Sequence, residues 1–369
     1  MRFDLSEEQE ELVSLLRTVL DQRSDGPAVR RAMASETGYD PELWRVLTEE
    51  IGAAALAIPE EYGGVGFTRL EQSLVLEGLG ANLAPSPYLG SVAIAAEAVR
   101  SSPDEIAKGR LLPGIADGSS IAALAWADAH GRWKPKRVDA HYDAETGTVT
   151  GTIPLVLEGA AADVLLLIAQ TPNGPGLFEV RDAAAVQRTV TPAVDPTLRF
   201  ATLRFDAVAV DPLLTGHAGA LDRLRDRALV AVSALQLGAA DRGLSMTVEY
   251  SKQRVQFGRP IGSFQALKHR MADMHVRLET ARTASRAASW ASAQDDPSLH
   301  ELAAVAKAWC TDSLDLIAAE TIQLHGGIAI TWEHDAQLVL KRAQALGALF
   351  GTAAEQRDRI ATSLGLVGT

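Results

Sequence analysis

The segment best suited to bind a cofactor brings a cation, an aromatic ring and glycines together. Arg254, Phe257, Gly258 and Gly262 follow directly after a long amphipathic pattern. A guanidinium in such a place can hold a pyrophosphate, and a neighbouring aromatic side chain can support an adenine. A helix that ends in a basic last turn gives the same pattern, so these residues alone leave both interpretations open.

A second break of the same kind lies later in the chain. Gln323 offers a side-chain amide, and Gly326 and Gly327 allow a ligand to approach the backbone closely. An ordinary corner between two helices would use the same residues. Because both breaks interrupt one helical region, we interpret them together as a candidate binding site.

Several other chemistries lack their sequence patterns. The eight histidines form no HExxH motif, and His269 and His275 lie on different faces of a helix. No GxSxG motif, Walker loop or GxGxxG motif is present. The single cysteine, Cys310, cannot form an intrachain disulfide or a thiolate cluster for a metal. We therefore expect no metal site.

Three regions with different patterns must position these residues. Residues 1–118 carry apolar side chains at helical spacing, with a capping-box pattern at Ser6 and Gln9 and an interruption at Gly63. Residues 119–216 contain short strand patterns without intervening helices, which favours an antiparallel β-domain. The expected strands cover residues 121–126, 148–156, 164–169, 177–180, 185–191 and 201–205.

Residues 217–369 return to long amphipathic patterns with short connections, which are typical of a helical bundle. The expected helices cover residues 221–254, 265–294, 297–324 and 334–364. We therefore predict an α+β fold with an N-terminal helical domain, a middle antiparallel β-domain and a C-terminal four-helix bundle.

Composition and charge exclude several classes of partner. The 369 residues are 47% hydrophobic, and 35 basic against 47 acidic side chains give a net charge of −12. Such an acidic surface repels phosphate backbones, so we expect no nucleic-acid partner. The acidic N-terminus and the lack of an apolar run of roughly 18–20 residues argue against secretion and against a membrane span. A single cysteine fits a reducing, cytoplasmic location.

The sequence resembles the acyl-CoA dehydrogenase superfamily over essentially its whole length. The resemblance rests on PEEYGG at residues 59–64, on YSKQRVQFGRPI at residues 250–261 and on QLHGGI at residues 323–328. The run TWEH at residues 331–334 is most similar to bacterial members that act on steroid side chains and related bulky acyl-CoAs. The resemblance implies an acyl-CoA substrate, FAD as cofactor, an electron-transfer acceptor protein and a tetrameric assembly.

The resemblance also implies roles for particular residues. Family members hold part of each FAD with a neighbouring subunit, which places Arg254 and Phe257 near the pyrophosphate and adenine of a partner's FAD. By the same match Gln265 is a further cofactor contact. The remaining implied cofactor residues are Gln323, Gly326, Gly327 and Thr352.

The sequence departs from the family where the catalytic base belongs. The family's usual glutamate precedes a Gly-Thr pair, which is Gly351-Thr352 here, and the preceding residue is Phe350. The alternative base position, early in the first bundle helix, falls on Ala228. Asp226 is a weak substitute, because two residues along a helix turn it about 200° from that face.

The flavin bed departs from the family pattern as well. Leu155 and Leu157 stand where the family often has a Trp-x-Thr pattern beside the flavin. Three hypotheses therefore remain open. The chain is a subunit of a heteromer whose paralogous partner supplies the glutamate, a self-sufficient homotetramer with an unrecognised base, or a flavin-free scaffold.

Overall fold

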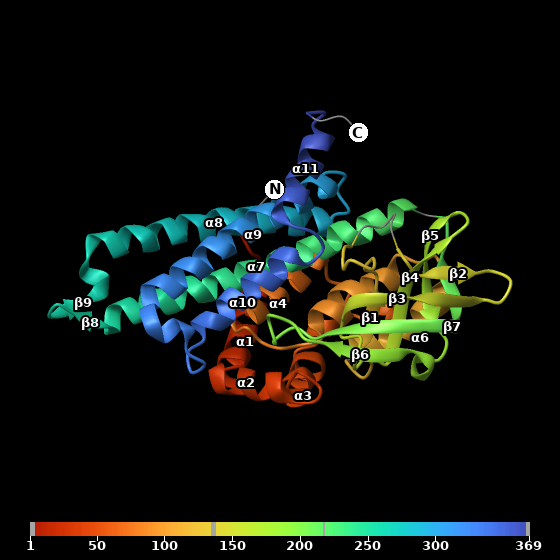
Figure 1. The fold of residues 1–369 in the computed structure, drawn as a ribbon, viewed down its shortest axis with the longest axis horizontal. Helices are drawn as coiled ribbons and strands as arrows, with labels where there is room; N and C mark the ends of the chain where they lie inside the picture. The colour runs from red at the N-terminus through yellow and green to blue at the C-terminus, as the bar shows by residue number, and fades with distance from the viewer. Residues whose placement is uncertain (1–3, 134–137, 217, 367–369) are drawn as a thin grey trace. The chain divides into compact units, whose positions relative to one another are not determined.

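The computed structural model describes residues 4–133, 138–216 and 218–366 of the chain. Contacts within the chain divide it into two compact units (Figure 1). The first unit contains Met1–Arg31, Ser73–Ala84 and Leu229–Thr369, and the second contains Ala32–Gln72 and Pro85–Ala228. The domain boundaries expected after residues 118 and 216 stay a prediction, because this division does not follow the order of the chain.

Helices fill the first part of the chain, as the sequence patterns predict. At the start of α1, Ser6 Oγ accepts from the Gln9 backbone at 3.3 Å and Gln9 Oε1 accepts from the Ser6 backbone at 3.0 Å, which confirms the capping box. Gly63, at φ 80°, ends a short turn and confirms the interruption. The helices are α1 (Glu7–Arg23), α2 (Gly26–Ala34), α3 (Pro41–Arg45), α4 (Arg69–Ala81), α5 (Ala96–Arg100) and α6 (Glu105–Ala116), with π-helical turns at Val46–Glu50 and Tyr88–Ala95.

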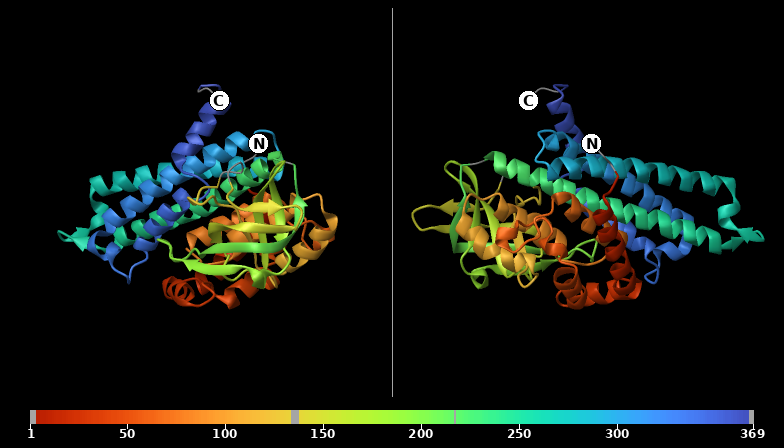
Figure 2. Two further views of the ribbon diagram at one scale, coloured as in Figure 1. Left: turned by 45° about the vertical axis from the view of Figure 1, so that its right-hand side comes forward. Right: turned by 180° about the vertical axis from the view of Figure 1, so that it is seen from behind.

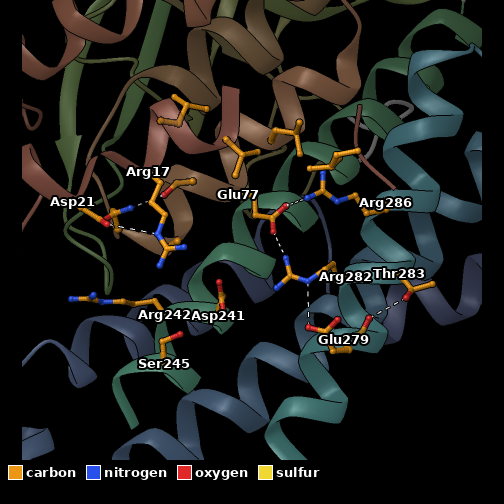
Figure 3. A pocket seen from close by; sticks show the side chains of 17 residues that line it. Arg17, Asp21, Glu77, Asp241, Arg242, Ser245, Glu279, Arg282, Thr283 and Arg286 are labelled. Carbon is orange, nitrogen blue, oxygen red and sulfur yellow. Dashed lines mark hydrogen bonds and ion pairs between the residues drawn. The ribbon is translucent and has the colours of Figure 1, made fainter. Parts of the chain in front are cut away.

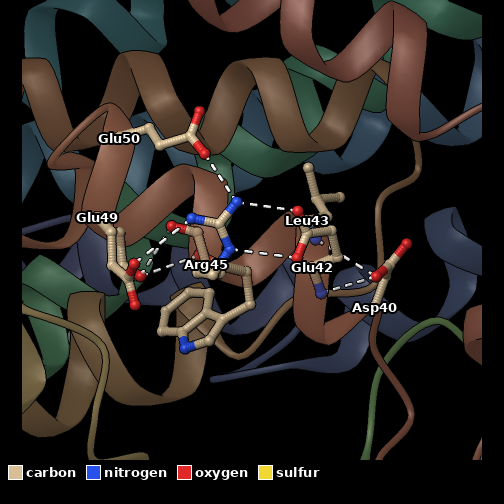
Figure 4. Close-up of polar contacts among 8 residues, drawn as sticks. Asp40, Glu42, Leu43, Arg45, Glu49 and Glu50 are labelled. Carbon is tan, nitrogen blue, oxygen red and sulfur yellow. Dashed lines mark hydrogen bonds and ion pairs between the residues drawn. The ribbon is translucent and has the colours of Figure 1, made fainter.

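Side chains fix the beginning of α3. Asp40 Oδ1 accepts from the backbone N–H groups of Glu42 at 2.9 Å and Leu43 at 3.3 Å, as an N-cap residue should. One turn later, Arg45 pairs with the carboxylates of Glu42 at 2.9 Å and Glu50 at 2.8 Å (Figure 4). This cluster lies on the surface, where ion pairs contribute little to stability.

The middle of the chain forms one mixed sheet in the second unit (Figure 2). Its strands in the described part of the chain are β1 (Ala122–Ala125), β2 (His141–Asp143), β3 (Thr148–Leu157), β4 (Val164–Thr171), β5 (Gly174–Val180), β6 (Gln187–Thr191) and β7 (Phe200–Leu214). Most of its pairings are antiparallel, as predicted, but β4 departs from this because it runs parallel to β1 and pairs in parallel with β2. Strand patterns do not reveal direction, since a connection long enough to return the chain permits a parallel pair.

The sheet encloses the apolar core of the second unit. Ile153, Leu167, Phe178 and Leu203 are 0% exposed, and they come from four different strands. Strand β7 continues well past the expected residues 201–205 because buried and exposed side chains go on alternating to Leu214. The pairing of β3 with β7 is irregular near the end of β3, which bends the backbone at that point.

The C-terminal region is helical, as expected, but its last element is divided. The helices are α7 (Ala218–Gln253), α8 (Gln265–Ala293), α9 (Leu299–His325), α10 (Ala336–Ala348) and α11 (Ala353–Ser363), and α8, α10 and α11 each contact α9. A single helix over residues 334–364 was therefore a wrong prediction. Phe350 at φ 58° and Gly351 at φ 107° leave the helical region, and Thr352 caps a new helix.

Helices α4 and α7 touch through their backbones at two glycines. A Cβ on Gly238 would lie 1.9 Å from the carbonyl oxygen of Glu77. A Cβ on Gly80 would likewise lie 2.2 Å from the carbonyl oxygen of Leu235. Any side chain at either position would force these helices apart.

The described residues also limit two other kinds of site. Within them, no helix is long and apolar enough to cross a membrane. The same residues hold no group of three or more His, Cys, Asp or Glu side chains placed to bind a metal ion. Cys310 is a buried free thiol.

Candidate functional site

The hairpin that follows α7 presents its side chains to solvent. Strands β8 (Val255–Gln256) and β9 (Arg259–Pro260) pair at the tip where α7 ends and α8 begins (Figure 1). Phe257 at φ 52° is 92% exposed, and its ring meets the Phe264 ring edge-on with centroids 6.2 Å apart. An aromatic side chain this exposed is available to a ligand or to another subunit.

Arg254 stands at the base of this hairpin. Its backbone N–H donates to the carbonyl of Tyr250 at 2.9 Å, and its carbonyl accepts from the N–H of Ile261 at 2.8 Å. The exposed guanidinium forms no hydrogen bond or ion pair with another residue that the structure describes. The backbone of Arg254 is therefore fixed while its charged group is free to bind an anion.

The second break directly follows α9. Gly326 adopts φ 66° and ψ −146°, and its N–H donates to the carbonyl of Ile322. A Cβ on Gly326 or Gly327 would meet nothing within 4 Å, so the backbone here is open to a close approach. The side chain of Gln323, one turn earlier, is exposed.

Stacked rings join the two breaks at one end of the bundle. Tyr250 stacks on His325 with centroids 4.5 Å apart, and His325 lies 4.7 Å from His334. His325 Nδ1 donates to the carbonyl of Thr321 at 2.7 Å. Burial lowers the pKa of both imidazoles.

Gln265 lies at the same end, as the first residue of α8. The Arg259 guanidinium covers the neighbouring Phe264 ring at 4.0 Å, which fixes the start of the helix. The Gln265 side chain is exposed. Arg254, Phe257 and Gln265 thus lie where α7 ends and α8 begins, and Tyr250 near the end of α7 stacks on His325 beside the glycine break.

Thr352 does not join this group within one chain. It follows the end of α10, whereas Gly326 and Gly327 precede its start, and the 13 residues of α10 span about 20 Å. Thr352 caps α11, where its Oγ1 accepts from the Glu355 backbone at 3.3 Å and Glu355 Oε2 accepts from the Thr352 backbone at 2.9 Å. Its local contacts are those of a capping box.

The residues at the hairpin end suit a dinucleotide in kind. They offer an unpaired guanidinium, exposed side-chain amides at Gln265 and Gln323, an exposed aromatic ring, and glycines at which a Cβ would meet nothing. Phosphates require such donors and close backbone approach, and adenine requires a flat apolar surface. The donor set therefore fits FAD.

The resemblance assigns the catalytic base to the positions of Phe350 and Ala228, and neither side chain can accept a proton. Phe350 is 5% exposed and Ala228 is 1% exposed. Asp226 is 3% exposed, and Arg225 Nε lies 3.7 Å from its Oδ1. Asp226 is thus a buried carboxylate that already has a cationic neighbour.

Sequence analysis missed one unusual carboxyl group. Glu158 is 6% exposed at φ 59°, and burial raises its pKa to about 8 although Arg199 opposes the shift. Gly90 leaves room for it, because a Cβ there would lie 2.8 Å from Glu158 Cγ. The signal in the sequence was a glutamate directly after the strand residue Leu157.

A cavity of about 610 Å³ lies in the first unit, between α1, α4, α7 and α8 (Figure 3). Arg286 donates to Glu77 at 2.7 Å, and Arg282 pairs with the same carboxylate. The ionic side chains that line it are Arg17, Arg242, Arg282 and Arg286 and, against them, Asp21, Glu77, Asp241 and Glu279. This balance favours neither an anion nor a cation, and no residue of the hairpin site lines the cavity.

Two family models match the chain. The acyl-CoA dehydrogenase N-terminal domain matches residues 6–119, and the acyl-CoA dehydrogenase C-terminal domain matches residues 223–365. Acyl-CoA dehydrogenase IpdE2 of Mycolicibacterium smegmatis is 38% identical over 356 residues, which cover 96% of this chain and 98% of that protein. Likeness over the full length of both proteins makes the match one of whole enzymes rather than of a shared domain.

Solved structures agree with these matches. The ChsE4-ChsE5 complex from Mycobacterium tuberculosis contains a chain that superimposes with a TM-score of 0.90 at 30% identity, covering 100% of both chains. A variant of the Tcur3481-Tcur3483 steroid ACAD superimposes with a TM-score of 0.89 at 30% identity, covering 98% of both. The chain therefore belongs to the acyl-CoA dehydrogenase family of FAD-dependent oxidoreductases.

Proposed function

We propose that this chain is one subunit of a heteromeric, FAD-dependent acyl-CoA dehydrogenase whose paralogous partner supplies the catalytic glutamate. The observation that carries the proposal is Phe350, a buried apolar residue directly before Gly351-Thr352. A phenyl ring cannot accept a proton. The hairpin end, by contrast, keeps every residue type needed to hold a dinucleotide.

The hairpin end would hold the ADP half of an FAD that is bound mainly by the neighbouring subunit. Arg254 would contact the pyrophosphate and Phe257 the adenine, with Gln265 as a further contact. Gln323, Gly326 and Gly327 would line the phosphates. When bound, FAD supplies the acceptor for the hydride that leaves the β carbon of the acyl-CoA, and an electron-transfer protein is the expected final acceptor.

Removal of the α proton is the step that this chain lacks. A general base must lie within hydrogen-bond reach of that proton. Phe350 and Ala228 fill the two expected places, so this chain contributes cofactor contacts and pocket walls while the partner's glutamate takes the proton. The self-sufficient alternative would require Asp226 or Glu158 as the base.

A bulky acyl-CoA is the proposed substrate class. The resemblance of residues 331–334 to steroid-type relatives supports it, and so does the likeness to the Tcur3481-Tcur3483 steroid ACAD. A tetramer of two chain types is the proposed assembly. On α8 and α9, Val276 is 61% exposed and Val305 is 39% exposed, which leaves apolar side chains for a subunit contact.

The test is co-expression with a paralogue that carries the glutamate before its Gly-Thr pair. Stoichiometry and flavin content of the purified material come first. Reduction of an electron acceptor is then measured with straight-chain and steroid-ring acyl-CoAs. We expect the isolated chain to stay near background and the complex to turn over ring-bearing substrates.

Replacement of the partner's glutamate by glutamine is the decisive control, and it should abolish turnover. Asp226→Asn and Glu158→Gln in this chain should leave the activity of the complex intact. Turnover by the isolated chain that one of these two variants abolishes would establish the self-sufficient enzyme instead. A purified complex without flavin would refute both the heteromeric and the self-sufficient enzyme hypotheses.

A further inference from the structure

One arginine from the N-terminal helices holds the segment that follows the glycine break. Arg30 of α2 donates to the carbonyl oxygen of Trp332 from Nε at 3.1 Å and from Nη2 at 2.9 Å. Its Nη1 donates to Asp335 Oδ1 at 2.6 Å and to the carbonyl of Gly26 at 3.1 Å. A single guanidinium thus ties α2 to a segment about 300 residues away in the chain.

The contact depends on the shape of its members. The planar fork of a guanidinium reaches two acceptors at once, whereas the ammonium of lysine cannot reproduce this geometry. Gly26 is equally specific, because a Cβ there would lie 2.8 Å from both carboxylate oxygens of Asp335. Arg242 Nη2 binds the other oxygen of Asp335 at 3.3 Å, so the carboxylate is held from two helices.

Three large apolar side chains in residues 328–332, between the glycine break and the contacts of Arg30, are exposed to solvent. Ile328 is 45% exposed, Ile330 is 76% exposed and Trp332 is 57% exposed. The Trp332 ring makes a cation–π contact with Lys341 Nζ at 4.4 Å. Ala329 alone is fully buried in this stretch, so the polar contacts of Arg30 contribute to its order.

We propose that Arg30 is a positioning residue for cofactor binding. It holds residues 332–335, and this fixes the direction in which the chain leaves the glycine break at Gly326 and Gly327. The His325 ring packs against His334 of the same segment and stacks on Tyr250 of α7, so the segment has contacts with both α2 and α7. The inference rests on the proposed function, since it presumes that the glycine break contacts FAD.

The test measures two properties separately: the order of residues 326–335 and the affinity for FAD. Hydrogen exchange of residues 326–335 is measured on protein freed of flavin, and FAD affinity is measured by fluorescence titration of the co-expressed assembly. The variants are Arg30→Gln, Arg30→Lys and Gly26→Ala. Arg45→Gln is the matched control, because Arg45 also binds several carboxylates but its partners are Glu42, Glu49 and Glu50, none of which lies in residues 326–335.

We expect Arg30→Gln to speed exchange of residues 331–335 and to weaken FAD binding by ~10–100-fold, because it loses charge-assisted hydrogen bonds. Arg30→Lys should recover part of both effects. Gly26→Ala should move both in the same direction as Arg30→Gln while it leaves the guanidinium in place. The control should change neither measurement.

Several results would overturn the inference. Faster exchange in Arg30→Gln with unchanged FAD affinity would show that Arg30 stabilises the segment but does not affect cofactor binding. Unchanged exchange in Arg30→Gln would show that Arg30 does not hold the segment. FAD affinity that falls equally in Arg45→Gln would also refute a specific role. A wild-type assembly that holds no FAD refutes the proposed function itself and the positioning role with it, which distinguishes the two failures.

Discussion

The hairpin end of the bundle and the turn that joins α10 to α11 differ in how far their side chains are exposed to solvent. At the hairpin, Phe257 is 92% exposed and Arg254 has a free guanidinium. At the turn, Phe350 is 5% exposed and the surrounding polar groups are used internally. The side chains of the hairpin end are available to a ligand or to another subunit, whereas those of the turn pack within the chain. Under the proposed function, the exposed hairpin would contact a cofactor shared with another subunit, while the buried turn would supply no base.

The largest expected effect tests the closed turn. Phe350→Glu restores the family's carboxylate at its usual position, yet we expect the isolated variant to stay near background. Loss of general-base catalysis costs ~10²–10⁴-fold, and a carboxylate alone does not rebuild a flavin bed with Leu155 and Leu157 in place. Acceptor reduction with a ring-bearing acyl-CoA measures it. Turnover of the isolated variant at the rate of the complex would show that the glutamate was the one missing part.

The turn can also be probed through a buried lysine. Lys307 is 0% exposed and donates to the carbonyl of Gly347 and to Thr311 Oγ1, each at 3.1 Å. Burial lowers its pKa from 10.5 to about 8. Between these two values the unfolded chain binds a proton that the folded chain does not, so stability should rise with pH in this window, by at most ~3 kcal/mol.

Lys307→Met should remove that rise. Chemical unfolding between pH 7.5 and 10.5, with wild type and variant side by side, measures the difference. Parallel pH profiles for the two proteins would contradict the assignment, because the remaining lysines and tyrosines titrate in both.

The open hairpin gives the next effect. Arg254→Ala should weaken FAD retention in the assembled protein, since a charge-assisted contact is worth ~1.5–3 kcal/mol. Phe257→Ala should have a smaller effect of the same sign, because a stacked ring contributes less. Flavin retained per subunit after gel filtration is the readout. Wild-type retention in Arg254→Ala would mean that the guanidinium serves another partner.

The smallest expected effect concerns pH at the hairpin end. The pKa values of His325 and His334 lie below 6.5, so acidification forces protons onto two imidazoles in contact. The folded state binds fewer of these protons than the unfolded state, and local stability should fall as the pH drops below 6.5. Hydrogen exchange of residues 326–335 at pH 5 and 7 measures it. His334→Gln should flatten the difference.

Periodicity and breaks in the pattern were sufficient to predict much of the fold. The capping box at Ser6 and the strand at residues 164–169 follow from local spacing, and the structure has both. The parallel pairing of β1 with β4 was out of reach because strand direction depends on connections rather than on local patterns. The break at Phe350 was hidden because an apolar run continues through Leu349 into it.

The candidate site was predictable only in part. Arg254 and Gln323 stand beside glycines, which mark breaks in any helical pattern. Arg30 lies within a helical pattern and gave no such signal, and Glu158 directly before Gly159 resembles an ordinary polar residue at a strand end. Their importance comes from partners far away in the sequence, such as Trp332 for Arg30 and Arg199 for Glu158.

The backbone contact between α4 and α7 limits how the chain can be divided. Residues 223–365 match the acyl-CoA dehydrogenase C-terminal domain, but α4 fills the groove at Gly238. Arg282 and Arg286 likewise depend on Glu77 of α4 for their counter-charge. If this C-terminal region were excised, it would expose a glycine-lined groove and two half-buried arginines without their carboxylate. The compact unit that contains the bundle also includes residues 1–31 and 73–84, so a fragment meant to fold on its own should carry all three segments.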